Sequence, residues 1–137
     1  MKYPQVRVHV HLTHERVILF VDTSGEPLFK RGWRADKGDA PLKETLAAAM
    51  LAACAWSQPL DGAPTGVSLG LPLYDPCCGS GTIPIEAAQI ACGIAPGLNR
   101  RFGFEKLLPF LRHVWQGLLE EARAAQHAPT APVFGSD

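Results

Sequence analysis

A run of small and polar residues that could bind a ligand lies near the middle of the chain, with Asp75 at its start and Gly79, Ser80 and Gly81 behind it. Apolar residues before Asp75 predict a strand and those from Thr82 onward predict a helix, so the glycines occupy the turn between them. Glycine has no Cβ, which permits positive φ and lets a ligand approach the backbone. The free N–H groups at the helix start can receive an anionic or polar group, and Asp75 can accept a ligand hydrogen bond at the carboxyl end of its strand.

The residues around the helix start indicate which kind of ligand-binding turn this is. Ser80 and Thr82 are types that commonly cap helix N-termini, and Pro84 fits the first turn of a helix. A P-loop would need a lysine where Gly81 stands, and a dinucleotide-binding loop would need a third glycine where Pro84 stands. The turn therefore follows neither of these two common glycine-rich patterns.

The residues 75–82, read as DPCCGSGT and followed by IEAA at 85–88, resemble motif I of the S-adenosylmethionine-dependent methyltransferases. This form is similar to that of the RNA guanine-N2 methyltransferases that carry an RNA-binding THUMP domain, a group often labelled as N6-adenine DNA methylases. The resemblance implies S-adenosyl-L-methionine as the cofactor and RNA as a partner. Its cofactor contacts carry over to Asp75, Pro76, Cys78, Gly79, Ser80, Gly81, Thr82 and, as the acidic residue that would hold the ribose hydroxyls, Asp137.

Composition limits the classes of protein that the chain can belong to. It has 137 residues, 47% hydrophobic and 19% charged, which predicts one globular domain and excludes a disordered chain. The formal net charge is +0, so any contact with nucleic acid must come from local basic clusters. No apolar run could span a bilayer and no signal peptide is recognisable, so we expect a cytoplasmic protein with no membrane partner. The four cysteines form no C-x-x-C pair, and we expect reduced thiols, mostly packed as small apolar groups, rather than disulfides or a metal site.

The N-terminal segment predicts an antiparallel hairpin. Residues 5–13 alternate between apolar and polar, as in a half-buried strand, and the apolar run at 17–21 indicates a strand covered on both faces. His9 and His11 could share a metal on the polar face, but without a third ligand nearby exposed strand histidines are the favoured interpretation. A helix is expected from Pro41 to about Trp56, with an apolar stripe formed by Leu42, Leu46, Met50 and Ala53.

A basic segment lies between the hairpin and that helix. Basic groups beside an aromatic ring can clamp phosphates and stack a base, and the candidates for RNA contact are Lys30, Arg31, Trp33 and Arg34. The alternative is an inter-domain linker whose Trp33 packs on a neighbour, and spacing alone does not separate the two. The pattern D-T-S-G-x-x-L-x-x-R-G-x-R is similar to a segment that lies between the THUMP region and the catalytic domain in the resembled family.

Two strands and two further helices complete the prediction. Strands are expected at 71–75 and 133–137, and helices at 82–93 and 108–125, with Glu86 as a solvated helix charge. The fold class is α/β: an incomplete Rossmann-like class I methyltransferase fold preceded by a β-hairpin and a linker helix. Residues 1–40 would be the hairpin and basic linker that follow a THUMP region, and residues 41–137 the first part of the methyltransferase domain.

The catalytic loop of the resembled family is not found in this sequence. That loop carries Asn-Pro-Pro-Tyr or a close variant, and no N-P-P or D-P-P triplet occurs in the chain, so no catalytic residue is assigned. We therefore expect a fragment that holds the linker and the first half of the cofactor site. A two-stranded sheet would leave an open edge, through which the chain could form a dimer.

Three functions remain open from the sequence. The first is a fragment of a methyltransferase acting on guanine N2 of large-subunit rRNA, that is, of 23S rRNA. The second is a fragment that acts on adenine N6 in DNA or RNA, which motif I does not distinguish from the first. The third is a non-catalytic RNA- or protein-binding module that uses residues 30–34.

Overall fold

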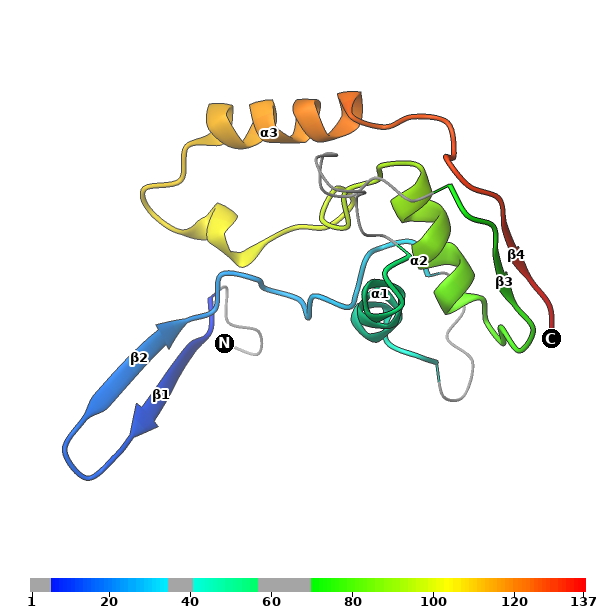
Figure 1. Cartoon of the computed structure of the whole chain (residues 1–137). Helices are drawn as coiled ribbons and strands as arrows, with labels where there is room; N and C mark the ends of the chain where they lie inside the picture. The colour runs from blue at the N-terminus through cyan, green and yellow to red at the C-terminus, as the bar shows by residue number, and fades with distance from the viewer. Residues whose placement is uncertain (1–5, 35–40, 57–69) are drawn as a thin grey trace.

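The computed structural model describes residues 6–34, 41–56 and 70–137. The predicted domain boundary between residues 40 and 41 lies outside the described residues. Four strands, three α-helices and one 3-10 turn occur in this part of the chain (Figure 1). They are β1 (Val8–Leu12), β2 (Val17–Val21), α1 (Glu44–Ala53), β3 (Leu73–Asp75), α2 (Thr82–Ala91), the 3-10 turn Gly103–Lys106, α3 (Arg112–Ala124) and β4 (Val133–Gly135).

The predicted hairpin is present and projects away from the rest of the molecule (Figure 1). Strands β1 and β2 are antiparallel, with Val8 opposite Val21 and Leu12 opposite Val17. Every residue of both strands is exposed, so the prediction that residues 17–21 are covered on both faces is wrong. An apolar run indicates that a strand needs cover, but it does not say whether the cover comes from the same chain. Among the described residues, no helix or second sheet packs on this hairpin.

Strands β3 and β4 form a separate parallel pair, in which Leu73 lies opposite Val133 and Asp75 opposite Gly135. Both strands were expected from the sequence, with slightly wider bounds. Helix α2 contacts both strands and also packs against α1 (Figure 1). Within the described residues, each strand of this pair has one edge without a strand partner. The arrangement is a strand–turn–helix unit with one added parallel strand, as expected for part of an α/β fold.

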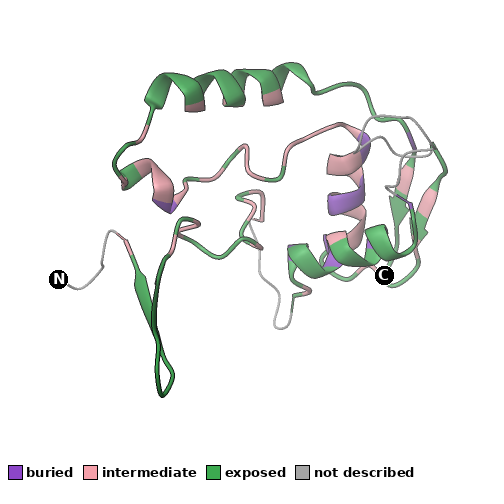
Figure 2. Ribbon diagram, turned by 60° about the vertical axis from the view of Figure 1, so that its left-hand side comes forward, coloured by how far each residue is buried: buried purple, intermediate pink, exposed green. Residues whose placement is uncertain are grey.

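A small core lies where α1, α2 and the parallel strands meet (Figure 2). It consists of Leu51, Trp56, Ala87, Ala91 and Ala131, with apolar side chains of β3, β4 and α2 packed against it. The alanines in α1 and α2 allow the two helices to approach closely. The indole N–H of Trp56 donates to the backbone oxygen of Leu71 over 3.0 Å, which satisfies the one polar group of this large side chain.

The predicted apolar stripe of α1 is not the face that is buried. Leu46 is 51% exposed and Met50 is 44% exposed, whereas Glu44, Ala47 and Leu51 are buried. The helix is rotated relative to the prediction because its buried face carries Glu44, whose carboxylate is paired with an arginine of the preceding segment. A burial pattern inferred from hydrophobicity alone could not include a charged residue.

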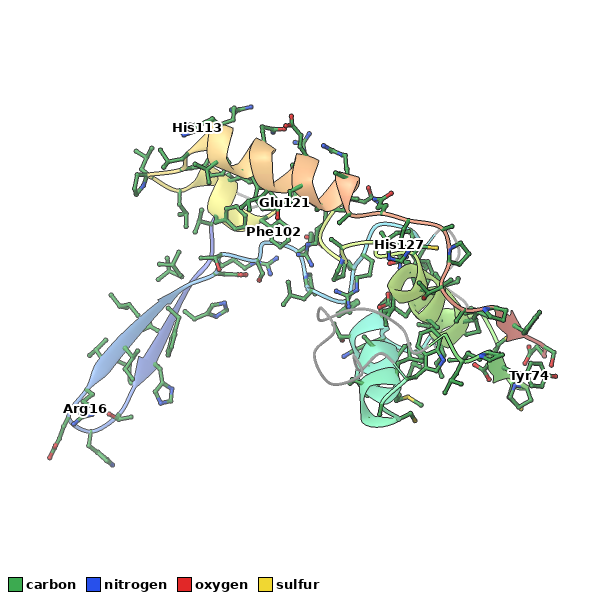
Figure 3. All side chains as sticks on the ribbon, turned by 45° about the horizontal axis from the view of Figure 1, so that its top comes forward. Arg16, Tyr74, Phe102, His113, Glu121 and His127 are labelled. Atoms are coloured by element: carbon green, nitrogen blue, oxygen red, sulfur yellow. The ribbon has the colours of Figure 1, made fainter. Side chains whose placement is uncertain are left out.

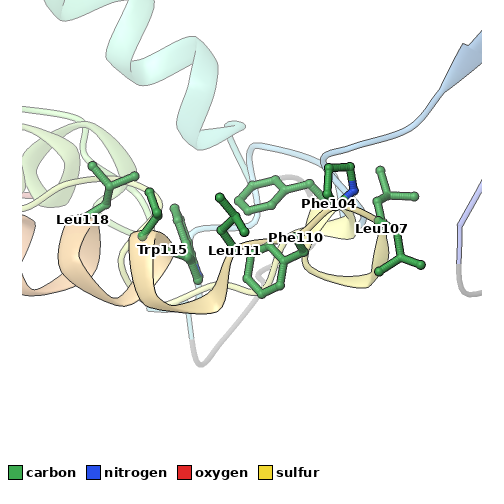
Figure 4. Close-up of a pocket in the computed structure, with 9 residues that line it drawn as sticks. Phe104, Leu107, Phe110, Leu111, Trp115 and Leu118 are labelled. Atoms are coloured by element: carbon green, nitrogen blue, oxygen red, sulfur yellow. The ribbon is translucent and has the colours of Figure 1, made fainter.

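Helix α3 is held to the chain by aromatic contacts rather than by a buried face. The ring of Trp115 meets those of Phe102 and Phe104 edge-on, at centroid distances of 5.6 and 5.0 Å. No residue of α3 is buried (Figure 2). An apolar groove of about 500 Å³ lies beside this cluster (Figure 4), and its lining includes Leu108, Leu111 and Leu118. No ionisable side chain lines the groove, so it offers packing area but no group for chemistry.

The connector after the hairpin is fastened to the segment before the 3-10 turn. The carboxylate of Asp22 accepts hydrogen bonds from the backbone N–H groups of Ser24 and Gly25, and the Ser24 hydroxyl bonded to it lowers the pKa of Asp22. Arg100 donates to the backbone oxygens of Ser24, Glu26 and Pro27. A Cβ on Gly103 would lie 2.9 Å from the oxygen of Asp22, so this approach needs glycine.

The cysteines depart in part from their predicted packing. All four are free thiols, but Cys54 and Cys77 are exposed, so the expectation that they pack as small apolar groups is wrong for these two. Cys77 is exposed because it belongs to the turn after β3.

In the described ranges, no helix is long and apolar enough to cross a bilayer.

Candidate functional site

The turn between β3 and α2, residues 76–81, is called the motif I turn here, and its two glycines have positive φ. Gly79 has φ 51° and Gly81 has φ 76°, a region that residues with a side chain rarely adopt. A Cβ built on Gly79 would meet no atom within 4 Å, so the backbone is open on that side. Glycine at 79 therefore serves the backbone conformation and leaves room for a ligand, rather than making way for another part of the chain.

The predicted helix caps are not the observed ones. Gly81 is the N-cap of α2 and no side chain caps the helix, although Ser80 and Thr82 were expected to do so. Pro84 lies in the first turn of α2, as predicted. The Ser80 and Thr82 hydroxyls are instead hydrogen-bond acceptors for Arg34, which explains why neither one caps the helix N–H groups.

Asp75 lies at the carboxyl end of β3, beside a cavity. Its Oδ1 atom accepts a hydrogen bond of 3.1 Å from the backbone N–H of Cys77, which orients the carboxylate at the beginning of the turn. A pocket of about 320 Å³ is lined by Asp75 together with apolar side chains such as Met50 and Ile83. Asp75 is the one charged residue among the described residues that line it. The carboxylate is therefore accessible to a small ligand at the strand end.

The end of β4 lies against the motif I turn from the other side. The N–H of Cys78 donates to the oxygen of Ser136 over 2.9 Å, and the N–H of Gly79 donates to Oδ1 of Asp137 over 3.3 Å. The Ser136 hydroxyl also lies 2.8 Å from the hydroxyl of Tyr74, at the end of the molecule far from the hairpin tip (Figure 3). The structure thus brings Asp75, Gly79 and Asp137 together, although Asp137 is remote from the other two in sequence.

Gly135 allows this approach and was not identified from the sequence. A Cβ at this position would lie 3.0 Å from Sγ of Cys78 and 3.1 Å from Cγ of Pro84. A glycine directly before the last residues of a predicted strand is a signal of close backbone contact that could have drawn attention to it.

The basic segment, residues 30–34, packs onto the two helices beside the motif I turn and is called the basic linker here. Arg34 donates from Nε to Oε1 of Glu44 and from a terminal nitrogen to Oγ1 of Thr82, both over 2.8 Å, and to the Ser80 hydroxyl over 3.2 Å. Arg31 and the Trp33 indole both approach the carboxylate of Glu86, at 3.5 and 3.4 Å. These contacts tie the linker to the start of α1 and to α2.

Glu86 lies on the buried face of α2. It was expected to be a solvated charge, but it is 3% exposed. Its carboxylate is the acceptor for Arg31 and Trp33, which supply the partners that a buried charge needs. Glu86 is the one charged residue in the otherwise apolar or uncharged sequence TIPIEAAQIA of α2, and such isolation is a signal for a buried pair.

The four residues predicted to contact RNA differ in accessibility. The side chains of Arg31 and Arg34 are 13% and 11% exposed, and both are engaged inside the chain. The Lys30 side chain is 48% exposed and pairs with Glu26, and this ammonium group lowers the pKa of the Glu26 carboxyl. This geometry favours the linker interpretation for the two arginines, and contact of the segment with RNA stays a prediction.

A model of the RMKL-like methyltransferase domain family matches residues 31–137. The chain belongs to this family. The match begins within the basic linker and includes the motif I turn, Asp75 and Asp137. The resemblance stated from residues 75–88 is therefore confirmed, and an α/β fold of the methyltransferase type agrees with the parallel strands and α2.

Two curated relatives from different bacteria carry the same name. The chain is 46% identical over 136 residues to the "Ribosomal RNA large subunit methyltransferase K/L" of Shewanella sediminis, covering 96% of this chain and 18% of the relative. It is 46% identical over 139 residues to the protein of the same name from Vibrio campbellii, covering 98% of this chain and 18% of the relative. The chain thus spans about a fifth of the length of these relatives.

Solved structures give a similar result. A Listeria monocytogenes protein, described as a predicted N6-adenine-specific DNA methylase, is 38% identical with a TM-score of 0.72, over 96% of this chain and 32% of that one. The protein SMU.472, described as a methyltransferase and solved in complex with S-adenosylhomocysteine (SAH), is 34% identical with a TM-score of 0.75, over 95% of this chain and 31% of that one.

The pairing of Glu86 with Arg31 generates a stability prediction. Substitution Glu86→Gln removes the negative charge and leaves a largely covered guanidinium without its ion pair, so we expect a loss of about 1–3 kcal/mol in the free energy of unfolding. The measurement is the urea unfolding midpoint followed by circular dichroism. Glu120→Gln, at an exposed position on α3, is the matched control and should change stability by less than about 0.5 kcal/mol. Equal effects of the two substitutions would contradict a buried ion pair at Glu86.

Proposed function

We propose that residues 1–137 supply the motif I half of the cofactor site of an S-adenosylmethionine-dependent RNA methyltransferase. The observation that carries the proposal is the open backbone at Gly79 between two carboxylates, Asp75 and Asp137, at the carboxyl ends of parallel strands. Ligands of open α/β sheets bind at this edge. Membership of a methyltransferase family and the similarity to a protein solved with SAH support the choice of cofactor.

The chemistry of the cofactor fits these groups. Its amino-acid part carries an ammonium group and its ribose carries two hydroxyls, all of which are hydrogen-bond donors to carboxylates. Asp137 uses Oδ1 for one bond to Gly79, whereas a carboxylate can accept about four hydrogen bonds, so capacity for ribose hydroxyls remains. Asp75, Pro76, Cys78, Gly79, Ser80, Gly81, Thr82 and Asp137 are the proposed cofactor-contact residues. When bound, the cofactor supplies an electrophilic methyl group on sulfonium sulfur.

Guanine N2 of 23S rRNA is the proposed methyl acceptor. The name shared by the relatives from Shewanella and Vibrio supports ribosomal RNA as the substrate class. Adenine N6 is the second candidate, supported by the description of the Listeria structure. Methylation of ribosomal RNA also agrees with the cytoplasmic location expected from the sequence.

The acceptor half of the site is proposed to come from polypeptide other than residues 1–137. The described residues include only two strands of the parallel sheet, and the chain matches 18% of its curated relatives and 32% of a solved structure. Apolar side chains of the sheet, such as Tyr74 and Phe134, are exposed. Their exposure supports the proposal that additional polypeptide packs on the sheet. When residues 1–137 are present alone, we propose that a second copy of the chain packs against the open edge of the β3–β4 sheet and forms a dimer.

Binding of SAH tests the cofactor proposal. Titration of SAH into the ¹⁵N-labelled chain should shift the amide signals of Gly79, Gly81 and Asp137. Gly79→Ala should weaken the affinity at least about tenfold, which corresponds to about 1.4 kcal/mol, because a Cβ there enters the open side of the turn and opposes positive φ. Gly117→Ala is the matched control, since no atom lies within 4 Å of its Cβ and its φ is not positive. No shift at millimolar SAH would remove the proposal.

Contact with RNA is tested at Lys30, because substitution of Arg31 or Arg34 would also disturb the fold. If Lys30 binds a phosphate, Lys30→Ala should reduce the slope of log affinity against log salt by about 0.7 for a single-stranded RNA. Lys106→Ala, at an exposed lysine outside the basic linker, should leave the slope unchanged. An identical slope for Lys30→Ala and the parent chain would argue against RNA contact there. RNA binding without SAH binding would favour a non-catalytic module.

The open sheet edge has a consequence for assembly that sedimentation can measure. We expect the isolated chain to sediment as a dimer at high concentration and to melt at a temperature that rises with protein concentration. Substitution of Phe134 by Lys, which places a charge beside the edge, should shift the equilibrium toward monomer. A sharp, concentration-independent melting transition of a monomer would contradict this proposal.

A further inference from the structure

We infer that Arg34 is a positioning residue for the motif I turn, so that the basic linker controls the conformation of the cofactor-binding backbone. The identity of the ligand as S-adenosylmethionine rests on the proposed function, whereas the positioning of the motif I turn by Arg34 does not. The inference starts from the fact that Arg34 contacts α1, the motif I turn and α2 at once.

The guanidinium of Arg34 distributes its donors over three parts of the chain. Nε donates to Glu44 on α1, one terminal nitrogen donates to Ser80 in the turn, and the other donates to Thr82 at the start of α2 and to the backbone oxygen of Leu42. The plane also lies 5.0 Å from the ring of Trp33. A rigid planar fork with five N–H groups can satisfy this set of acceptors, whereas the single ammonium of lysine cannot reach all of them.

Burial strengthens the bonds that Arg34 makes to Glu44 and Thr82, whereas its bond to Ser80 is exposed. The side chains of Arg34 and Glu44 are 11% and 5% exposed, and Thr82 is 3% exposed. Charge-assisted hydrogen bonds in such surroundings are stronger than those at a solvated surface. Glu44 thus holds the guanidinium in place, and the guanidinium in turn holds the two hydroxyls.

The two hydroxyls have an alternative use, which is why Arg34 affects the turn in particular. Ser and Thr side chains readily bond to nearby backbone N–H groups and cap helices. Here Gly81 is the N-cap and no side chain caps α2, since Ser80 and Thr82 face Arg34. Without the guanidinium, Ser80 is free to become the cap, and the cap position moves by one residue. That change rotates the backbone of Gly79 and Gly81, whose positive φ angles form the open side of the turn.

Amide hydrogen exchange of the ligand-free chain, measured by mass spectrometry, tests the inference. Arg34→Lys should raise exchange rates in residues 76–82 at least about tenfold, or about 1.4 kcal/mol of local opening, and should leave α3 unchanged. Arg100→Lys is the matched control. Arg100 also fastens the segment after the hairpin through backbone oxygens, but it contacts no residue of the motif I turn.

Two further variants separate positioning from general stability. Ser80→Ala removes an exposed hydroxyl and should raise exchange in the turn without unfolding the chain. In Ser80→Ala combined with Thr82→Val, the change Arg34→Lys should have no additional effect on the turn, because the two hydroxyls through which Arg34 contacts the turn and the start of α2 are gone, although Glu44 and Leu42 remain as acceptors. Equal exchange in the turn for Arg34→Lys and the parent chain would overturn the inference. A rise spread evenly over α2, β4 and α3, matched by Arg100→Lys, would overturn it as well.

The SAH titration runs on the same variants and keeps the two proposals distinct. If the parent chain binds SAH, Arg34→Lys should weaken the affinity about tenfold while Arg100→Lys does not. If the parent chain binds no SAH but Arg34→Lys still opens the turn, the cofactor proposal fails and the positioning role stands.

Discussion

The parallel pairing of β3 with β4 is the contact on which the candidate site depends. It brings Asp137 beside Gly79 and continues past the strands, because Cys78 donates to Ser136 and Ser136 donates to Asp75. The turn is thereby bonded through Cys78 and Gly79 to the two residues that follow β4, and α2 contacts both strands. Two carboxylates and an open backbone meet only because this pairing exists. The small core of Leu51, Trp56 and the alanines of α2 supports it.

The basic linker behaves as part of the same unit rather than as a free connection. Arg31 and Trp33 share the carboxylate of Glu86, and Arg34 is bonded to both helices. The family match likewise begins at residue 31. Buried charges are costly unless paired, so two glutamates on facing helices oblige the linker to lie where it does. The hairpin beyond it, in contrast, has no apolar partner in the described part of the chain.

The sequence predicted the elements well and the side-chain partners poorly. Alternating and helical patterns located the hairpin, both parallel strands and the three helices, since those patterns depend on local residues. The glycine turn was recognisable because positive φ limits the choice of residue. The buried face of α1, the caps of α2 and the burial of Glu86 were missed for one physical reason. Each depends on an ion pair or hydrogen bond to the basic linker, which no periodic pattern in a single helix contains.

The proximity of Gly135 to Cys78 and Pro84 has a genetic consequence. Every missense change of a glycine codon adds at least a Cβ atom, and at this position that atom would already lie within 3.0–3.1 Å of three atoms of those two residues. The motif I turn would have to move away from β4 to admit it. Codon 135 should thus be among the least tolerant of the chain in a saturation library, although the residue itself has no group that could contact a ligand.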